Sequence, residues 1–242
     1  MGKPDAGTPR ERYRAQVREE IKKYAWEQIA TAGASALSLN AIAKQIGMSG
    51  PALYRYFAGR DELITELVMD AYRSLADTFQ AEAAAGAGLG ELAQALRRWA
   101  LDDPQRYLLV YGTPVPGYHA PEATTRITSQ IMAVLLDAAT AGRPSAAPAD
   151  QPPAPADQPP APADQPPAPA DQPPAPPSPL ETHLDEHRLW AGGHPAPALR
   201  RALAFWSRLH GVLSLELAGH FTGMGFDPAR LYAAEAETVA DG

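Results

Sequence analysis

A proline-rich repeat near the middle of the chain limits what can fold around it. The heptapeptide Ala-Asp-Gln-Pro-Pro-Ala-Pro occurs four times in tandem, starting at Ala149, Ala156, Ala163 and Ala170. Proline lacks an N–H donor and fixes its own φ, so no helix or central strand can run through this density of prolines. A docking site for a proline-binding domain is less favoured than a repeat-expanded surface loop that leans toward polyproline II. We therefore expect residues 144–179 to form a disordered insert.

Apolar residues recur at helical spacing on both sides of this insert, and no stretch alternates as a half-buried strand does. The hydrophobic fraction of the 242 residues is 45%, which is enough for a folded core. The expected helices span residues 12–32, 39–46, 49–57, 60–84, 91–101, 104–111, 121–141, 197–221 and 227–239, with ordered structure also at 180–190. Residues 112–120 contain Pro114, Pro116 and Gly117 and should form an irregular turn. These patterns predict an all-α fold.

Charge is distributed unevenly along the chain. The net charge is −7, but residues 1–60 carry 10 Lys and Arg against 5 Asp and Glu, a net of +5. The remaining residues carry 11 against 23, a net of −12. A basic head on an acidic body places an attractive potential where DNA would dock. From the charge alone, a solvated basic surface without a partner is the favoured interpretation, so this observation only supports other evidence.

Composition also bears on cellular location. The chain has no cysteine, which excludes disulfides and thiolate metal sites and fits a reducing cytoplasm. Residues 1–8 are polar and lack the apolar segment of a secretory signal. The best apolar runs, such as residues 131–136, are far too short to span a bilayer. We expect a cytoplasmic protein without membrane contact.

The most informative segment runs from Ser38 to Phe57, where two short helices joined through Gly47 have the spacing of a helix-turn-helix. Ser38 is placed to cap the first helix, and Ala43 is small enough for the second helix to cross close above it. Gly47 permits a positive φ at the tight turn. Leu53 and Phe57, one helical turn apart, would anchor the second helix in the core. The alternative, a helical hairpin with no DNA role, does not explain the Leu-Tyr-Arg-Tyr-Phe string or the basic helix ahead of it.

The second helix turns about 100° per residue, so part of its surface faces away from Leu53. The residues that a major groove would meet there are Pro51, Ala52 and Arg55, with Tyr54 on the flank. Arg55 is the best candidate for base contact, because a guanidinium can pair bidentately with guanine. Phosphate contacts set the register without reading sequence, and the residues better placed for them are Tyr54, Tyr56 and Arg60.

Residues 12–75 resemble the N-terminal domain of the TetR family of one-component bacterial repressors. The motifs that carry this resemblance are Ile42-Ala43, Gly47-Met48-Ser49, Leu53-Tyr54-Arg55-Tyr56-Phe57 and Arg60-Asp61-Glu62-Leu63. The resemblance implies DNA contacts from Ser38, Ser49, Gly50, Pro51, Tyr54, Arg55, Tyr56 and Arg60. At one of these positions, Gly50, many members of the family have a polar or basic side chain instead.

The C-terminal part is similar to the TetR C-terminal class named WHG for its Trp, His and Gly. The similar segments are 103–107 (Asp-Pro-Gln-Arg-Tyr), 112–117 (Gly-Thr-Pro-Val-Pro-Gly) and 206–211 (Trp-Ser-Arg-Leu-His-Gly). This similarity implies a homodimer and a ligand cavity in the larger domain. The candidate ligand-binding residues are Trp99, Tyr107, Tyr111, Trp206 and His210, although the aromatic residues also fit a simple core. His210, Glu216 and His220 lack a signature metal spacing, so we expect His210 to be a hydrogen-bonded core residue and expect no metal site.

The segment 197–221 is apolar over a wide part of its helical circumference. One stripe comprises Leu199, Leu203, Trp206, His210, Leu213, Leu217 and His220, and a second stripe beside it comprises Ala202, Phe205, Leu209 and Val212. A helix this apolar needs partners on two sides. We therefore expect it to pack on its own core and on a second subunit.

These observations predict two domains. Residues 1–84 would hold the helix-turn-helix and its connecting helix, and residues 85–242 the ligand-binding and dimerisation part with the insert. The predicted function is a homodimeric transcriptional repressor that a small-molecule effector releases from a near-palindromic site on double-stranded DNA. The alternatives are an effector-independent DNA-binding protein and a small all-α enzyme. The sequence has no nucleophile elbow, phosphate loop or dinucleotide fingerprint, so we expect neither catalysis nor a cofactor.

Overall fold

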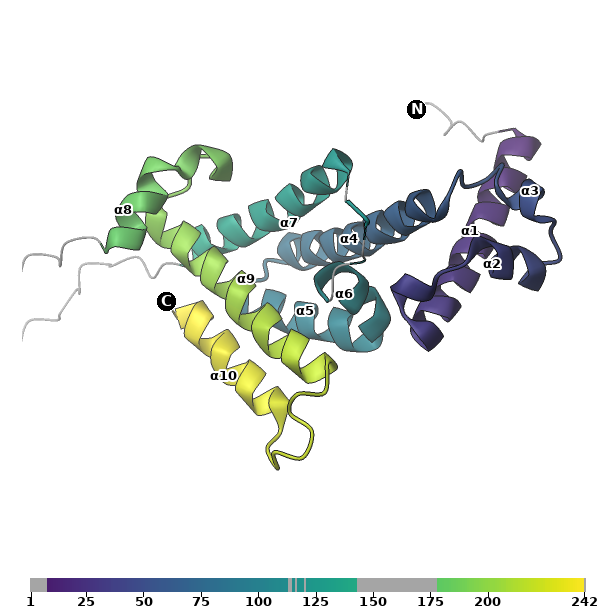
Figure 1. Ribbon diagram of the computed structural model, residues 1–242. Helices are drawn as coiled ribbons and strands as arrows, with labels where there is room; N and C mark the ends of the chain where they lie inside the picture. Colours follow the sequence, from purple (N-terminus) through teal and green to yellow (C-terminus); the bar gives the residue numbers. More distant parts are fainter. Residues whose placement is uncertain (1–7, 113–114, 116, 120, 143–177, 242) are drawn as a thin grey trace, which may run out of the picture.

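The computed structural model describes residues 8–112, 115, 117–119, 121–142 and 178–241 (Figure 1). Within these residues every regular element is a helix and none is a strand, which confirms the predicted all-α fold. None of the helices in this part of the chain is long and apolar enough to cross a membrane.

The N-terminal helices surround one hydrophobic core at one end of the molecule (Figure 1). They are α1 (Pro9–Ala32), the 3₁₀ turn η1 (Ala34–Ala36), α2 (Leu39–Gln45) and α3 (Gly50–Leu53). Helix α1 begins at Pro9 because Thr8 and Glu11 form a capping box, in which each side chain accepts the backbone N–H of the other residue. Its buried stripe is Val17, Ile21, Ala25 and Ile29, spaced one helical turn apart.

Helix α4 (Arg60–Ala84) leaves the N-terminal unit and continues into the larger part of the molecule (Figure 1). Its first half buries Leu63, Ile64, Leu67 and Val68 in the N-terminal core, and its second half buries Leu75, Ala76 and Phe79 in a second core. Tyr72, between these two sets, packs against both cores. The domain boundary predicted after residue 84 stays a prediction. Helix α4, which precedes that boundary, contributes some of its residues to each core.

The larger part is a bundle in which α4 packs on α7 and α9 packs on both α7 and α10. Its helices are α5 (Leu89–Asp102), α6 (Pro104–Tyr111), α7 (Glu122–Ala141), α8 (Pro179–Glu186), the 3₁₀ turn η2 (Arg188–Ala191), α9 (Ala196–Leu217) and α10 (Pro228–Asp241). The structure describes some residues of the irregular turn predicted after α6, and two of them lie against the N-terminal core. Val115 is buried there, and the Tyr118 hydroxyl lies 3.2 Å from Thr65 Oγ1 on α4.

Several predicted boundaries differ from the structure, and three of these differences have a visible physical reason. The helix predicted over 49–57 ends at Leu53 and continues as turns, because side chains of α1 bind the carbonyls that follow. The helix predicted to end at residue 221 ends at Leu217, since Gly219 adopts a φ of 77°. The predicted insert 144–179 lies outside the described residues except for its last two, Ser178 and Pro179. Ser178 caps α8, so ordered structure begins two residues before the predicted position, residue 180.

Arg201 is a buried cation that joins the ends of two helices. It donates from one guanidinium nitrogen to the carbonyl of Ala139 at 2.9 Å and from another to that of Ala240 at 2.7 Å. Both carbonyls lie in the last turn of a helix, α7 or α10, where intrahelical donors run out and the helix dipole is negative. No ion pair joins Arg201 to a carboxylate in the described part of the chain, so these helix ends stabilise its charge.

We expect Arg201→Met to lower the free energy of unfolding by about 2–4 kcal/mol, because one buried and one partly buried carbonyl lose charged donors. Urea unfolding of both proteins measures this as a lower midpoint at an unchanged slope. Arg73→Met is the matched control, since Arg73 is half-exposed and its one ion pair among the described residues is with Asp70, one turn away. The control should change stability by less than about 0.5 kcal/mol, and an equally small effect at Arg201 would contradict its structural role.

Candidate nucleic-acid interface and ligand cavity

The turn between α2 and α3 has the geometry of a helix-turn-helix. Gly47 adopts a φ of 68°, a left-handed conformation that glycine accommodates without strain. The N–H of Met48 then donates to the carbonyl of Ala43 at 2.8 Å. Leu53 and Phe57 are fully buried, as the sequence predicted, and so fix one side of α3 in the N-terminal core. The other side of α3 is left at the surface.

The residues predicted to contact DNA lie together on this unit but differ in exposure. Ser49, Pro51, Tyr54 and Arg55 are exposed, whereas Ser38, Gly50, Ala52, Tyr56 and Arg60 are partly buried. Ser38 caps α2, its hydroxyl accepting the N–H of Ala41 at 3.3 Å. Arg60 donates to the carbonyl of Ala34 at 2.9 Å and so holds η1 in place. The exposed set therefore centres on the C-terminal end of α3 and the turn that follows it.

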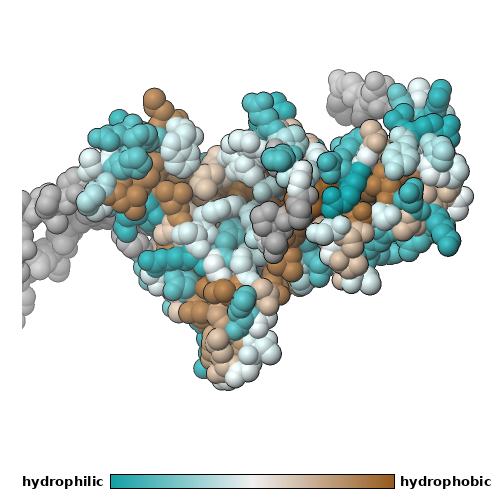
Figure 2. Space-filling model, viewed as in Figure 1, coloured by the Kyte–Doolittle hydropathy of each residue, from teal (hydrophilic) through white to brown (hydrophobic). Residues whose placement is uncertain are grey.

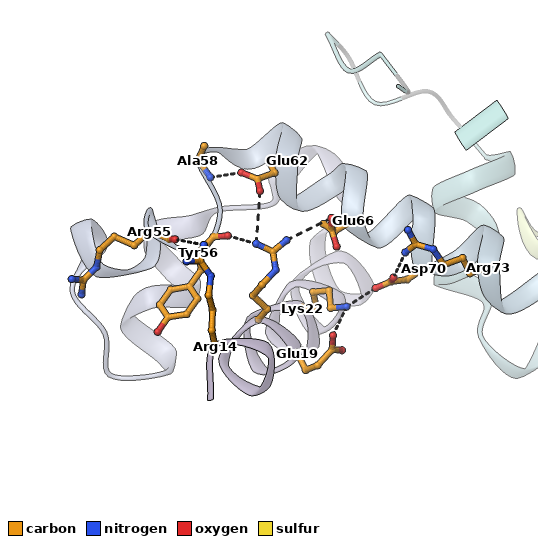
Figure 3. A network of polar contacts seen from close by, with 11 residues as sticks. Arg14, Glu19, Lys22, Arg55, Tyr56, Ala58, Glu62, Glu66, Asp70 and Arg73 are labelled. Atoms are coloured by element: carbon orange, nitrogen blue, oxygen red, sulfur yellow. Dashed lines mark hydrogen bonds and ion pairs between the residues drawn. The ribbon is translucent and has the colours of Figure 1, made fainter. Parts of the chain in front are cut away.

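Two arginines of α1 hold that turn. Arg14 donates to the carbonyl of Arg55 at 3.2 Å, and Arg18 donates to the carbonyl of Tyr56. Carbonyls just beyond a helix carry partial negative charge and lack intrahelical donors, so cations are favourable partners for them. Figure 3 shows the result: the backbone of Arg55 is bound by Arg14, while the Arg55 side chain points away from the network.

The same face of α1 is bound to α4 by ion pairs. Arg18 lies 3.8 Å from Glu62 and 3.6 Å from Glu66. Lys22 lies 2.6 Å from Asp70, further along α4. Burial lowers the pKa of Lys22, but its hydrogen bonds to the carboxylates of Asp70 and of its neighbour on α1 outweigh burial and raise that pKa above its ordinary value. These pairs attach the N-terminal unit to the first half of α4 (Figure 3).

The sequence analysis missed the role of Arg14, Arg18 and Lys22, which hold the α3 turn and α4 against α1. They were counted in the basic head, yet they bind groups within the protein. The charge offered to a partner therefore comes from exposed residues such as Lys23, Lys44 and Arg55. A helical stripe with basic residues at positions 14, 18 and 22, one turn apart, was the available signal, since such a stripe faces a single neighbour.

A surface depression of about 280 Å³ lies beside the Arg55 side chain. The residues lining it are Arg10, Tyr13, Arg14, Arg55 and Tyr56. Tyr13 is 64% exposed although it belongs to the apolar pattern of α1. Guanidinium groups beside phenol hydroxyls suit phosphate oxygens, because both are hydrogen-bond donors. The N-terminal turn of α1 thus extends the basic surface next to α3.

A cavity of about 490 Å³ lies in the larger part of the molecule, between α4, α6, α7, η2 and α9. Its described lining comprises Tyr72, Tyr111, Thr128, Ser129, Met132, Ala133, Leu136, Trp190, Ala191, Gly192, His194 and Trp206. Two of the five predicted ligand-binding residues, Tyr111 and Trp206, line it. Trp99, Tyr107 and His210 do not line it, and the ligand contact predicted for all five residues stays a prediction. Those three are buried in the layer behind, because an aromatic residue type does not reveal which layer of a core it occupies.

His210 forms the centre of that second layer. Its ring lies 4.2 Å from the ring of Tyr111 and 4.4 Å from that of Trp206, measured between ring centres. The Tyr107 hydroxyl lies 3.1 Å from His210 Nδ1 and 2.9 Å from the hydroxyl of Ser214. Burial lowers the pKa of His210 to about 3, so the imidazole is neutral. Its hydrogen bond and stacking support the prediction of a core histidine.

The cavity wall has no carboxylate, lysine or arginine side chain among the described residues. The rings of Tyr72, Tyr111, Trp190 and Trp206 line it. Tyr72 and Tyr111 meet edge to face with ring centres 6.0 Å apart. The Tyr111 hydroxyl is buried without a hydrogen-bond partner in the described part of the chain, and burial raises its pKa. Such a site suits an uncharged molecule with a flat apolar part and hydrogen-bonding groups, since Thr128, Ser129 and His194 also line it.

Two family descriptions match the chain. Residues 21–67 match the bacterial regulatory proteins of the tetR family, and residues 89–239 match the tetracyclin repressor-like C-terminal domain. The solved structure of the protein SCO4313 is 59% identical, covers 96% of this chain and 98% of its own, and superposes with a TM-score of 0.78. A TetR/AcrR family regulator from Thermobifida fusca superposes with a TM-score of 0.52 at 16% identity, over 94% of this chain and 98% of that one, which shows a shared fold alone.

Two curated relatives are the HTH-type transcriptional regulators Mb1846 of Mycobacterium bovis and Rv1816 of Mycobacterium tuberculosis. Each is 40% identical over 136 residues, which is 53% of this chain. The match spans 58% of the length of each relative.

We expect acid to weaken the fold through His210. The unfolded chain restores the ordinary pKa of 6.5, so below that pH it binds a proton that the folded state, with a pKa of about 3, does not bind. Stability should therefore be complete above pH 6.5 and fall below it, by up to about 1.4 kcal/mol per pH unit from this group. Urea unfolding near pH 7 and near pH 5 should show a steeper loss in the wild type than in His210→Gln. Equal losses in the two proteins would contradict the assignment.

Proposed function

Because this chain belongs to the TetR family of bacterial regulatory proteins, we propose that it is a homodimeric, DNA-binding transcriptional repressor of the cytoplasm. In this proposal it binds a near-palindromic operator and is released by a small-molecule effector. The observation that carries the DNA-binding part is the two-sided character of α3 and the turn that follows it, residues 50–57. One side is fully buried through Leu53 and Phe57, and the other exposes Pro51, Tyr54 and Arg55.

A helix presented in this way fits the major groove of DNA. Arg55 is the proposed base-reading residue, because its guanidinium is exposed while Arg14 binds its backbone carbonyl. Because the backbone of Arg55 is bound, the positions that its side chain can reach are limited. Discrimination between bases requires a side chain that is positioned in this way. Tyr54 and the basic depression with Arg10 and Tyr13 are the proposed phosphate contacts, which set position without reading bases.

The cavity is the proposed effector site, and α4 is the proposed link to DNA. Tyr72 lines the cavity and packs against both cores. On the same helix, Glu62, Glu66 and Asp70 hold the α1 side chains Arg18 and Lys22. An effector that changes the position of Tyr72 would move α4 and so the two α3 helices of a dimer. An uncharged aromatic compound that raises the melting temperature without weakening operator binding would instead support the effector-independent alternative.

The proposed dimer surface is the outer side of α9 and α10. The two predicted apolar stripes of α9 are mostly buried within the chain, so less of this helix is left for a partner than the sequence implied. Leu215 on α9 and Leu231 on α10 are exposed, as are Met224 and Phe226 in the connection between them. Apolar colour is visible over this end of the molecule in Figure 2. Gly211 lies on the exposed side of α9, where a partner helix could approach closely.

We expect Arg55→Ala to lower affinity for the operator more than affinity for scrambled DNA. A lost bidentate contact with guanine corresponds to about 1–3 kcal/mol of discrimination. Gel-shift titration on an operator selected from random DNA, at fixed salt, measures both affinities. Arg98→Ala is the matched control, because Arg98 is 61% exposed on α5 and remote from α3. Equal loss on both DNAs would reassign Arg55 to phosphate, and no loss on either would refute the proposed interface.

We expect Gly211→Glu to dissociate the dimer and to weaken operator binding with it. A Cβ at Gly211 meets no atom within 4 Å in the subunit, so the fold should tolerate the change. One subunit alone makes few phosphate contacts and binds weakly. Light scattering and gel shifts test both effects, with Gly90→Glu on α5 as control, since a Cβ there also meets nothing. A wild-type monomer that binds a palindromic site tightly would refute the dimer.

A further inference from the structure

We propose that the C-terminal turn of α8 is a binding site for a first-row divalent cation, with zinc as the best fit. The site comprises His183, Glu186 and His187, from the segment His-Leu-Asp-Glu-His. One possible ligand atom from each residue lies within 4.8 Å of the other two. The sequence analysis weighed His210 and His220 for metal and missed this cluster, although its spacing of three and four residues places all three side chains on one helical face.

The hydrogen bonding of His187 prepares it for coordination. Its Nδ1 lies 2.9 Å from the carbonyl oxygen of His183, and a carbonyl can only accept, so Nδ1 carries the proton. In neutral imidazole the lone pair is then on Nε2, which is the tautomer that binds a metal through Nε2. Ligating histidines in proteins commonly have this kind of supporting bond to a backbone carbonyl. The rings of His183 and His187 are already adjacent, with centres 4.3 Å apart.

The third group, Glu186, supplies the charge that a dication requires. The neighbouring acids on α8 are already paired, Asp185 with Arg188 at 3.4 Å and Glu181 with Arg200 at 3.3 Å. No ion pair of the described residues involves Glu186. Two imidazoles and one carboxylate suit zinc, copper and nickel better than magnesium or calcium, which prefer oxygen ligands alone. All three side chains are exposed, so water would complete the coordination shell of the bound ion. We assign only metal binding to this site.

The position of the site connects it with the cavity. His187 is the C-cap of α8 and directly precedes η2, whose Trp190 and Ala191 line the cavity wall together with Gly192. A metal bridging His183 and His187 would restrict the start of η2. The site lies at the opposite end of the molecule from α1–α3, so it is separate from the proposed DNA surface (Figure 1). A metal site here goes beyond the proposed function and does not depend on it.

Isothermal titration of the tag-free, full-length protein with zinc chloride tests the proposal. The wild type should bind one zinc per chain. His183→Ala and His187→Ala should each weaken binding by about tenfold or more, since loss of even a supporting contact costs about 10- to 100-fold. Glu186→Gln should weaken it less, because the amide keeps the shape and loses the charge. His220→Ala is the matched control, an exposed histidine outside the cluster, and should bind like the wild type.

Cobalt substitution gives a second readout, because coordination of nitrogen changes the visible absorption of the ion. The wild type and His220→Ala should show this change, and His183→Ala with His187→Ala combined should not. Circular dichroism without metal shows that the variants keep their helices, as expected for exposed positions. The proposal is overturned if the wild type binds no zinc below millimolar concentration. It is equally overturned if the double variant binds zinc as the wild type does.

Discussion

Helix α4 is shared by two hydrophobic cores, and the rest of the structure depends on this sharing. Its first half is buried among α1–α3 and its second half among α5–α10, with Tyr72 between them. A continuous hydrogen-bonded helix transmits displacement along its axis better than a loop does, because its backbone cannot bend freely. The N-terminal unit and the cavity are therefore joined by one helix. This shared helix is the physical basis of the proposed coupling between a small molecule and DNA binding.

Electrostatic pairing decides how the N-terminal unit is held on that helix. Arg18 lies between the carbonyl that follows α3 and the carboxylates of α4, and Lys22 repeats the attachment one turn further along. These groups are partly buried, where paired charges interact more strongly than at the open surface. Arg14 and Arg18 also hold the turn that follows α3, since they bind the carbonyls of Arg55 and Tyr56. The basic side chains of the N-terminal unit thus hold the unit in position, in addition to the attraction that they offer to phosphate.

Local patterns in the sequence predicted the helix-turn-helix well. Gly47, Leu53 and Phe57 behave as expected, because a tight turn and a one-turn apolar pair depend on residues close together in the chain. The cavity was predicted only in part. Tyr111 and Trp206 line it, but His210 lies behind it and Trp190 was missed. Aromatic residue types predict burial, and burial alone does not distinguish the wall of a cavity from the layer that supports it.

The sequence by itself determined the all-helical class and the turn that positions α3, since both follow from spacing within short segments. Its motifs also carried the resemblance to the family to which the chain belongs. Only the tertiary structure decided which basic residues are internal, which aromatic residues enclose space and how much of α9 remains exposed. Each of these depends on contacts between residues far apart in the chain. Arg18 and Glu66, or Tyr72 and Trp190, become neighbours only when the helices pack. Helical periodicity specifies which face of each helix is buried and does not specify what it is buried against.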